Sequence, residues 1–451
     1  MSRVVALGVA LVALAQWAPC AAASPAPQGS RSAARAAAPA TDRTSDAARF
    51  SDPRSRVDRV LELTDARLSL MPGVAAWKWE HHAPVTDPAR ERVVIRAAVK
   101  LAAPLGLAPE PIERLFAFEV RLAREEETAL YERWRRRGFD FHGRVPDLGK
   151  DLRPQLDRLT HDLLDALYLA APVLARVGFP ERYAPQAARA LASAGWSDAG
   201  RRELLADLGQ VRLTTAPALA RIEASHLLRI GTTGDYAPFS AQSQGALRGV
   251  DIDLARDLAT RLGARPVFVR TAWSTLLQDL NRNEFDVAVG GISDTPAREA
   301  LAATSVAYLT GGKTIIAPCR EASRFGSLSA VDKRGVRVIV NPGGTNEQYA
   351  RTHLRRAQLR VHPDNSTIFD ELAAGRADVM ITDEVEVELQ THQHRGLCRA
   401  FPGTLTHEDK VILLARDPAL TAAVNDWLRG ELAAGLPQRL LRQALSSGGD
   451  R

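Results

Sequence analysis

Apolar residues recur at helical spacing in the first half of the chain and in short runs in the second. From position 56 to 79 they fall three or four residues apart, which predicts one long helix that bends at Pro72. Further helices are predicted at 88–103, 111–137, 151–177, 185–194 and 198–224. Nothing in this half alternates apolar and polar residues as a strand does. The first half is therefore predicted to be all-α.

Beyond residue 225 the pattern changes to short β runs set among helices. Strands are predicted at 227–232, 267–270, 285–289, 336–340 and 379–382, with a helix at 251–262. This alternation is typical of a parallel-sheet α/β domain. The predicted domains are therefore 51–218 and 227–451, joined by a linker over 219–226.

The N-terminus reads as an export signal. Arg3 precedes an apolar run too short to cross a bilayer, and Ala21-Ala22-Ala23 offers a small-residue cleavage site. Residues 1–23 are predicted to be a signal peptide, and 24–50, rich in Ala, Pro and Ser, a disordered linker. We expect a periplasmic or secreted protein that has no membrane span after cleavage near Ala23.

Composition limits the classes of ligand to be expected, and the cysteine count indicates a disulfide or a metal site. With 451 residues, 45% hydrophobic and 25% charged, the chain can form two globular domains. The net charge of +6 suits anionic small molecules, nucleic acid or an anionic membrane, but no nucleic-acid module is present, so no nucleic-acid partner is expected. After cleavage only Cys319 and Cys398 remain, which in an exported protein indicates one disulfide. A metal site with His392 and His394 is the alternative, without a supporting motif.

The helical half carries cations at unusual places. Taken singly, such residues are solvated side chains on a helix face. Together they form one pattern: Arg67-Leu68-Ser69-Leu70-Met71-Pro72-Gly73-Val74-Ala75, then Trp77-Lys78-Trp79, then Asp87-x-x-Arg90-Glu91. This pattern resembles the secreted, all-helical class of chorismate mutases, over about residues 55–215.

That resemblance implies a site for a dicarboxylate, chorismate, which rearranges to prephenate without a nucleophile or a proton transfer. The positions that match the family's cations are Arg67, Lys78, Arg90 and Arg153. Glu127 matches the Glu or Gln near the ether oxygen and should be protonated there to donate a hydrogen bond. Ala123 and Val94 replace polar residues of relatives. A dimer is implied by analogy with the family.

Motifs in the second half resemble the periplasmic solute-binding proteins for amino acids. They are Gly231-Thr232-Thr233-Gly234-Asp235-Tyr236-Ala237-Pro238-Phe239, Gly249-Val250-Asp251-Ile252-Asp253-Leu254-Ala255 and Gly291-Ile292-Ser293-Asp294-Thr295-Pro296-Ala297-Arg298. The resemblance implies a two-lobed α/β fold of the periplasmic-binding-protein type (type II) that closes on a ligand. Arg298 is suited to hold a carboxylate, and Thr295 adds a hydroxyl. Trp273 is either a wall of the cleft or a core residue.

A more specific set of motifs resembles the periplasmic cyclohexadienyl dehydratases, which act on prephenate and arogenate. The set includes Gly311-Gly312-Lys313-Thr314, Asn341-Pro342-Gly343-Gly344-Thr345-Asn346-Glu347 and Gly375-Arg376-Ala377-Asp378-Val379-Met380-Ile381-Thr382-Asp383. The resemblance places the catalytic acid on Glu347, whose pKa burial should raise. Lys313 joins the substrate-binding cations, and the turn at Gly344 and Thr345 directs amides at an anion. Asp383 either meets an α-amino group or caps the next helix.

The two halves thus handle consecutive compounds of phenylalanine biosynthesis. We expect a bifunctional enzyme, a chorismate mutase followed by a prephenate or arogenate dehydratase, with no metal and no organic cofactor. A solute-binding protein fused to a helical module is the alternative.

Overall fold

The computed structural model describes residues 50–193 and 195–447. The predicted signal peptide and all but the last residue of the predicted 24–50 linker lie outside the described residues. That last residue, Phe50, is not disordered. It forms an isolated bridge with Phe268, and the guanidinium carbon of Arg270 lies 4.0 Å from the centre of its ring.

Helix α1 (Pro53–Ser69) begins where Asp52 accepts a hydrogen bond from the amide of Arg54, with Pro53 in the first turn. The predicted bent helix is wrong at Pro72. The chain leaves the helix at Leu70, and α2 (Met71–Glu80) starts with Pro72 in its first turn. Proline has no amide hydrogen, so it fits a helix start better than a helix interior.

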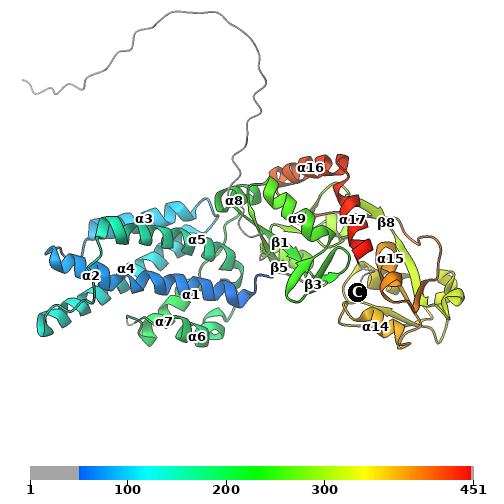
Figure 1. The fold of residues 1–451 in the computed structure, drawn as a ribbon, viewed down its shortest axis with the longest axis horizontal. Coiled ribbons are helices and arrows are strands. Elements are labelled where there is room, and N and C mark those ends of the chain that lie inside the picture. The colour runs from blue at the N-terminus through cyan, green and yellow to red at the C-terminus, as the bar shows by residue number, and fades with distance from the viewer. Residues whose placement is uncertain (1–49, 194, 448–451) are drawn as a thin grey trace, which may run out of the picture. The chain divides into compact units, whose positions relative to one another are not determined.

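The remaining helices of this half pack around one apolar core. They are α3 (Pro88–Ala102), α4 (Pro109–Arg137), the short π-helix η1 (Leu148–Leu152), α5 (Arg153–Leu174), α6 (Phe179–Ala190), α7 (Asp198–Leu208) and α8 (Ala218–Ser225). In Figure 1, α1, α3, α4 and α5 form the elongated part of this bundle. Helix α1 packs on α5, and α4 packs on α2, α3 and α7. The predicted all-α character is confirmed.

The α/β half contains two five-stranded sheets. The first has the order β5-β1-β6-β15-β7 and the second β11-β10-β12-β9-β13. The strands of the first sheet are β1 (Leu227–Thr232), β5 (Arg265–Arg270), β6 (Val287–Ala288), β7 (Ala303–Thr304) and β15 (Leu413–Leu414). Those of the second sheet are β9 (Lys313–Pro318), β10 (Arg337–Val340), β11 (Gln358–Val361), β12 (Val379–Asp383) and β13 (Leu397–Arg399). The pairs β1–β5, β1–β6, β10–β11 and β10–β12 are parallel. Each sheet with its helices forms one lobe.

The chain passes between the lobes twice. The outgoing strand β8 (Leu309–Gly311) and the returning strand β14 (Glu408–Lys410) pair antiparallel. A third small sheet, β2 (Asp235–Tyr236), β3 (Ser240–Ser243) and β4 (Ala246–Arg248), follows β1. The remaining elements are α9 (Val250–Arg261), α10 (Leu276–Asn281), α11 (Pro296–Glu299), the 3₁₀ helix η2 (Ala322–Phe325), α12 (Leu328–Val331), α13 (Thr345–His353), α14 (Ile368–Ala373), α15 (Glu384–Gln393), α16 (Pro418–Ala433) and α17 (Leu436–Ser447).

The segment predicted as a 219–226 linker is structured. It forms most of α8, which packs on α16 and β1. Ala218 and Ile222 are buried in the core of the first lobe, because they repeat at the i, i+4 spacing of one helix face. The helix predicted over 198–224 is interrupted between Leu208 and Ala218, where Gly209 and Pro217 lie.

The structure pairs Cys319 with Cys398 in a disulfide across 79 residues. Within the described residues, no three His, Cys, Asp or Glu side chains are grouped so as to hold a metal ion, and His392 and His394 therefore form no such group with a cysteine. None of the described helices has the length and apolar content needed to cross a membrane.

Candidate active sites

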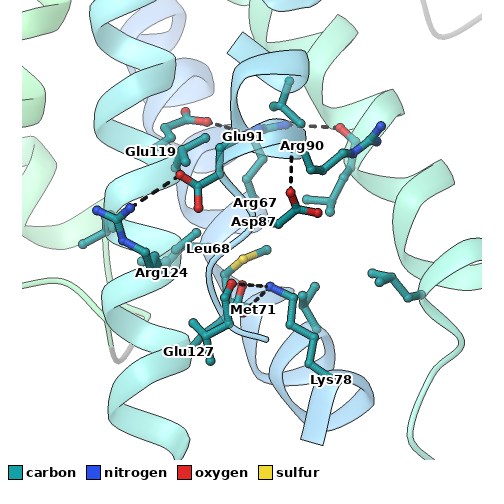
Figure 2. A pocket seen from close by; sticks show the side chains of 18 of the residues that line it. Arg67, Leu68, Met71, Lys78, Asp87, Arg90, Glu91, Glu119, Arg124 and Glu127 are labelled. Carbon is teal, nitrogen blue, oxygen red and sulfur yellow. Dashed lines mark hydrogen bonds and ion pairs between the residues drawn. The ribbon is translucent and has the colours of Figure 1, made fainter. Parts of the chain in front are cut away.

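The helical half encloses a cavity of about 340 Å³ between α1, α2, α3, α4 and α5 (Figure 2). All five residues predicted for this site line it: Arg67, Lys78, Arg90, Glu127 and Arg153. They come from five different helices, which explains why the sequence separates them by as much as 86 positions (153 − 67). Val94 and Ala123, the two departures from the family pattern, also line the cavity and make that part of its wall apolar.

The cations of this cavity are held in two ways. Arg67 is fixed: its Nε lies 2.7 Å from a carboxylate oxygen of Glu119, and its Nη1 lies 2.6 Å from Oγ1 of Thr160. Arg90 stands in the first turn of α3, whose start Asp87 caps by accepting from the Arg90 amide at 3.0 Å. Within the described part of the chain, the guanidinium groups of Arg90 and Arg153 form no hydrogen bond or ion pair. Two cations are therefore available to an anionic ligand.

Lys78 and Glu127 form a largely buried ion pair in the wall of the cavity. Nζ of Lys78 lies 2.6 Å from Oε2 of Glu127 and 2.9 Å from the carbonyl oxygen of Val85, and Figure 2 shows the ion pair. Burial raises the pKa of Glu127, and Lys78 opposes that shift only in part. The direction agrees with the expectation that Glu127 carries a proton.

Several polar groups of this site were not predicted, among them Glu119 and Arg124. Glu119 is buried, and its second oxygen, Oε1, has no hydrogen-bond partner in the described residues. Arg124 lines the cavity and lies 3.5 Å from Glu91. Glu119, Ala123 and Glu127 follow one another at intervals of four, so helical spacing from the two predicted positions could have identified Glu119.

The second site is a cleft between the lobes of the α/β half. Its lining includes Tyr236, Trp273, Arg298, Asn341, Gly344, Thr345, Asn346 and Asp383. Only about 20 Å³ of free space remains, little more than one water needs. The lobes also bond directly, since Nδ2 of Asn365 donates to the carbonyl oxygen of Asp235 at 2.9 Å. The lobes are therefore closed.

Arg298 is one of the residues that line this cleft. It is buried in the first turn of α11, and its Nη1 donates to the carbonyl oxygen of Ser293 at 2.5 Å. Burial lowers its pKa from the ordinary value of an arginine. Thr295 does not line the cleft. It caps α11, accepting from the Arg298 amide at 3.3 Å, and so positions the arginine rather than reaching a ligand itself.

A buried cluster of charges surrounds Asp383. One carboxylate oxygen lies 3.1 Å from Nζ of Lys313, and the other lies 2.5 Å from Nζ of Lys410 and accepts from the hydroxyl of Tyr236. Burial alone would raise the pKa of Asp383, but the two ammonium groups hold it well below its usual range. Asp383 stands at the N-cap of α15 without a side-chain capping bond, so it meets ammonium groups instead of capping that helix.

Glu347 is held by two donors outside the lining of the cleft. Its side chain does not line the cleft, although its neighbours Gly344, Thr345 and Asn346 do. It accepts from the amide of Gly343 at 2.7 Å and from Nε of Arg351 at 2.8 Å. Burial acts to raise its pKa, but these two donors outweigh burial and leave the pKa lowered, the opposite of the predicted direction.

Of the two alternatives for Trp273, the structure favours a position in the cleft wall. It lines the cleft, its ring meets that of Tyr236 edge-on with centres 5.7 Å apart, and its Nε1 donates to Asp235 at 3.2 Å. The sequence interpretation missed Tyr236, Asn346 and Lys410 as site residues. Lys410 had no motif around it, and Tyr236 was quoted only as part of a motif.

Two lobes joined by paired crossover strands around a closed cleft define the periplasmic-binding-protein class of fold. Residues 228–444 match the bacterial extracellular solute-binding proteins, family 3, and residues 57–128 match chorismate mutase type II. The chain belongs to the family 3 solute-binding proteins and carries a type II chorismate mutase domain ahead of that region. The predicted fusion and fold class are confirmed.

Individual relatives match the second half. Cyclohexadienyl dehydratase of Pseudomonas aeruginosa is 44% identical over 220 residues, which are 48% of this chain and 82% of that protein. The histidine-binding periplasmic protein of Escherichia coli is 29% identical over 254 residues, 54% of this chain and 96% of that protein.

Solved structures also match this half. The crystal structure of an ancestral amino acid-binding protein, a precursor of cyclohexadienyl dehydratase, is 33% identical with a TM-score of 0.47, covering 51% of this chain and 100% of that one. An ancestral cyclohexadienyl dehydratase is 42% identical with a TM-score of 0.33, covering 51% and 98%.

Proposed function

We propose that this chain is a bifunctional enzyme. Its helical half converts chorismate to prephenate, and its α/β half removes water and carbon dioxide from prephenate to give phenylpyruvate, or from arogenate to give phenylalanine. The observation that carries the proposal is the convergence of four cations and one buried glutamate in a single cavity, ahead of a domain 44% identical to a cyclohexadienyl dehydratase.

In the helical cavity the chain's residues act by position and charge. The free guanidinium groups of Arg90 and Arg153 bind the two carboxylates of chorismate and hold its compact conformer. Arg67, fixed by Glu119, and Lys78 add positive charge where the ether oxygen becomes negative as its bond breaks. Protonated Glu127 donates a hydrogen bond to that oxygen. No proton leaves the substrate and no covalent intermediate forms.

In the cleft, buried Arg298 holds the side-chain carboxylate of prephenate while the ring loses its hydroxyl group and carbon dioxide. The electron pair of the breaking C–C bond completes the aromatic ring, and the departing hydroxyl takes a proton to leave as water. Glu347 is the proposed donor. To reach the ring it exchanges its bonds to Gly343 and Arg351 for a place in the cleft, one residue beyond Asn346 in the wall.

The test is to supply chorismate to the purified protein and follow phenylpyruvate. Arg90→Ala is expected to abolish prephenate formation and to leave turnover of added prephenate intact. Arg92→Ala, an exposed arginine on the same helix that does not line the cavity, is the matched control and should change neither activity. No phenylpyruvate from added prephenate would reject the dehydratase half of the proposal.

A solute-binding protein with a helical module is the second candidate, favoured by the match to the histidine-binding protein over 54% of the chain. It predicts tight binding of a ligand that is recovered unchanged.

We further propose that the protein acts in the periplasm or is secreted, after cleavage near Ala23. Mass spectrometry of the exported protein tests the cleavage site, and sedimentation tests the dimer expected by analogy.

A further inference from the structure

The outward side of α3 carries a row of exposed apolar side chains. Ala89, Val93, Ala97 and Leu101 follow one another at intervals of four, the spacing that places residues on one side of a helix, and all four are exposed. The exposed fractions of Val93 and Leu101 are 44% and 37%. A single apolar side chain on a surface needs no explanation, but a continuous row of them marks an interaction surface.

A second row on the same side of α3 is cationic. Arg92, Arg96 and Lys100 also follow at intervals of four, and all three are exposed. Among the described residues, their side chains form no hydrogen bond or ion pair. The two acids at the start of the helix are engaged elsewhere, since Asp87 caps the first turn and Glu91 pairs with an arginine of α4. Three unpaired charges of one sign therefore lie beside the apolar row.

The two rows serve neither the core nor the cavity of the helical half. Helix α3 lies along one edge of this half (Figure 1) and packs on α4 and α5. Its buried residues are Ala98 and Ala102, and Glu91 and Val94 line the cavity. None of the seven residues in the two rows belongs to the apolar core or lines the cavity. Their exposure is therefore not a consequence of the mutase site.

We propose that this outward face of α3, made by residues 89, 92, 93, 96, 97, 100 and 101, docks on a membrane surface that carries anionic phospholipid headgroups. Arginine and lysine attract such headgroups, and apolar side chains beside them enter the boundary between headgroups and acyl chains. A second copy that met this face across a twofold axis would bring the same three cations against it, which is repulsive. The charge of the face thus selects an anionic surface over a second copy.

The first experiment mixes the intact chain with lipid vesicles and measures the bound fraction by cosedimentation. Vesicles of equal parts phosphatidylglycerol and phosphatidylcholine are compared with vesicles of phosphatidylcholine alone, at roughly 0.15 M salt. Partitioning at least about 10-fold stronger to the anionic vesicles is expected, because each of the three cations adds to the attraction. Equal partitioning to the two kinds of vesicle overturns the proposal.

A triple substitution tests whether α3 makes the contact. Arg92→Gln, Arg96→Gln and Lys100→Gln together should lower partitioning to the anionic vesicles by at least about 10-fold and leave mutase kcat/KM unchanged. The matched control makes the same change in net charge by replacing three exposed cations of the second lobe with glutamine, Lys333, Arg334 and Arg355. The control should keep the parent's partitioning to within about twofold. Equal losses in the two variants would show that net charge alone attracts the protein, and would overturn the assignment to α3.

The apolar row distinguishes docking from attraction by charge alone and from contact between two copies. Val93→Ser with Leu101→Ser leaves the net charge unchanged and should weaken partitioning by at least about 5-fold. Unchanged partitioning in this double variant overturns the proposed insertion. Sedimentation without vesicles is the second measurement. A parent dimer that the double variant converts to monomers, with no binding to anionic vesicles by the parent, would assign the face to a second copy and overturn the proposal.

Discussion

At the scale of single residues, the role proposed for Glu127 depends on its protonation. Burial raises its pKa, and the proposed donation of a hydrogen bond to the ether oxygen requires the proton. We therefore expect mutase kcat/KM to fall as pH rises through that raised pKa. Glu127→Gln, which donates at every pH, should remove this fall, whereas Glu127→Ala should lose about 10²–10³-fold in kcat. The same alkaline fall in the Gln variant would assign the titration to another group.

Glu386 gives a second pH prediction, on stability rather than rate. Its carboxyl group is buried, and burial raises its pKa to about 8. Between the ordinary pKa near 4.5 and about 8 the folded chain binds this proton more tightly than the unfolded chain. The free energy of unfolding therefore falls as pH rises through this window, by up to about 1.4 kcal/mol per pH unit from this group. Glu386→Gln should be progressively more stable than the parent from pH 5 to 8 in denaturant titrations.

Substitution of Glu347 distinguishes a catalytic role of this residue from a structural one. With Glu347 as the proposed general acid, Glu347→Gln should lower the dehydratase rate by about 10²–10⁴-fold and leave substrate binding intact. Arg351 lowers its pKa, so Arg351→Met should raise that pKa and move the alkaline limb of the dehydratase profile to higher pH. A glutamate that only caps Gly343 would instead leave rate and profile unchanged, and Glu347→Gln would then affect thermal stability alone.

The residues predicted from the sequence were those that sit in dense motifs. Arg90 was expected in the site because the motif Asp87-x-x-Arg90-Glu91 resembles that of the secreted chorismate mutases, and the structure places it in the cavity. Partners brought by the fold were not predictable in the same way. Lys410 reaches Asp383 from a strand 27 positions away, and no local pattern distinguishes it from a surface lysine.

At the scale of elements, the period of the hydrophobic pattern and the length of each helix or strand determined which elements could be predicted from the sequence. The buried run Leu227–Thr232 was predicted to the residue, since every position faces core. Strands of two or three residues, such as β7 (Ala303–Thr304) and β13 (Leu397–Arg399), are too short to show a period of two and were missed. Most of α8 was assigned to the 219–226 linker although a helix was also predicted over 198–224, and only the structure shows that a separate helix begins at Ala218.

The turn after β10 gives a prediction at this scale. Gly343 has a φ of +78°, and a Cβ there would lie 2.8 Å from the backbone nitrogen of Ser274 in the opposite lobe. Gly343→Ala should therefore hinder closure and lower dehydratase kcat/KM by at least about 10-fold, with mutase activity unchanged as an internal check. Gly335→Ala, at a φ of +84° with nothing within 4 Å, is the control for backbone strain alone. Equal losses in both variants would show that closure is not involved.

At the scale of the whole molecule, the helical half and the first lobe of the α/β half share one apolar core. The described residues belong to one compact unit, and Leu227 and Val267 of the first lobe are buried in the same cluster as the helices. The guanidinium carbon of Arg229, on β1, lies 4.7 Å from the ring centre of Tyr168 on α5. Each site takes its residues from one half, which favours separable activities, but the apolar surface between the halves favours a single folding unit.

A substitution at Asp286 tests whether the two halves unfold together or separately. It is fully buried and accepts from Nη2 of Arg229 at 2.6 Å and from Nη2 of Arg221 at 3.3 Å. Asp286→Ala leaves both arginines buried without this carboxylate, and should cost about 3–5 kcal/mol of stability. Because Arg229 packs on Tyr168, we expect both activities to be lost together at a lower temperature. The control Asp253→Ala removes an exposed ion pair to Arg256 and should cost under about 1 kcal/mol. A heated Asp286→Ala protein that loses dehydratase activity but keeps mutase activity at the parent's temperature would show that the helical half is stable on its own.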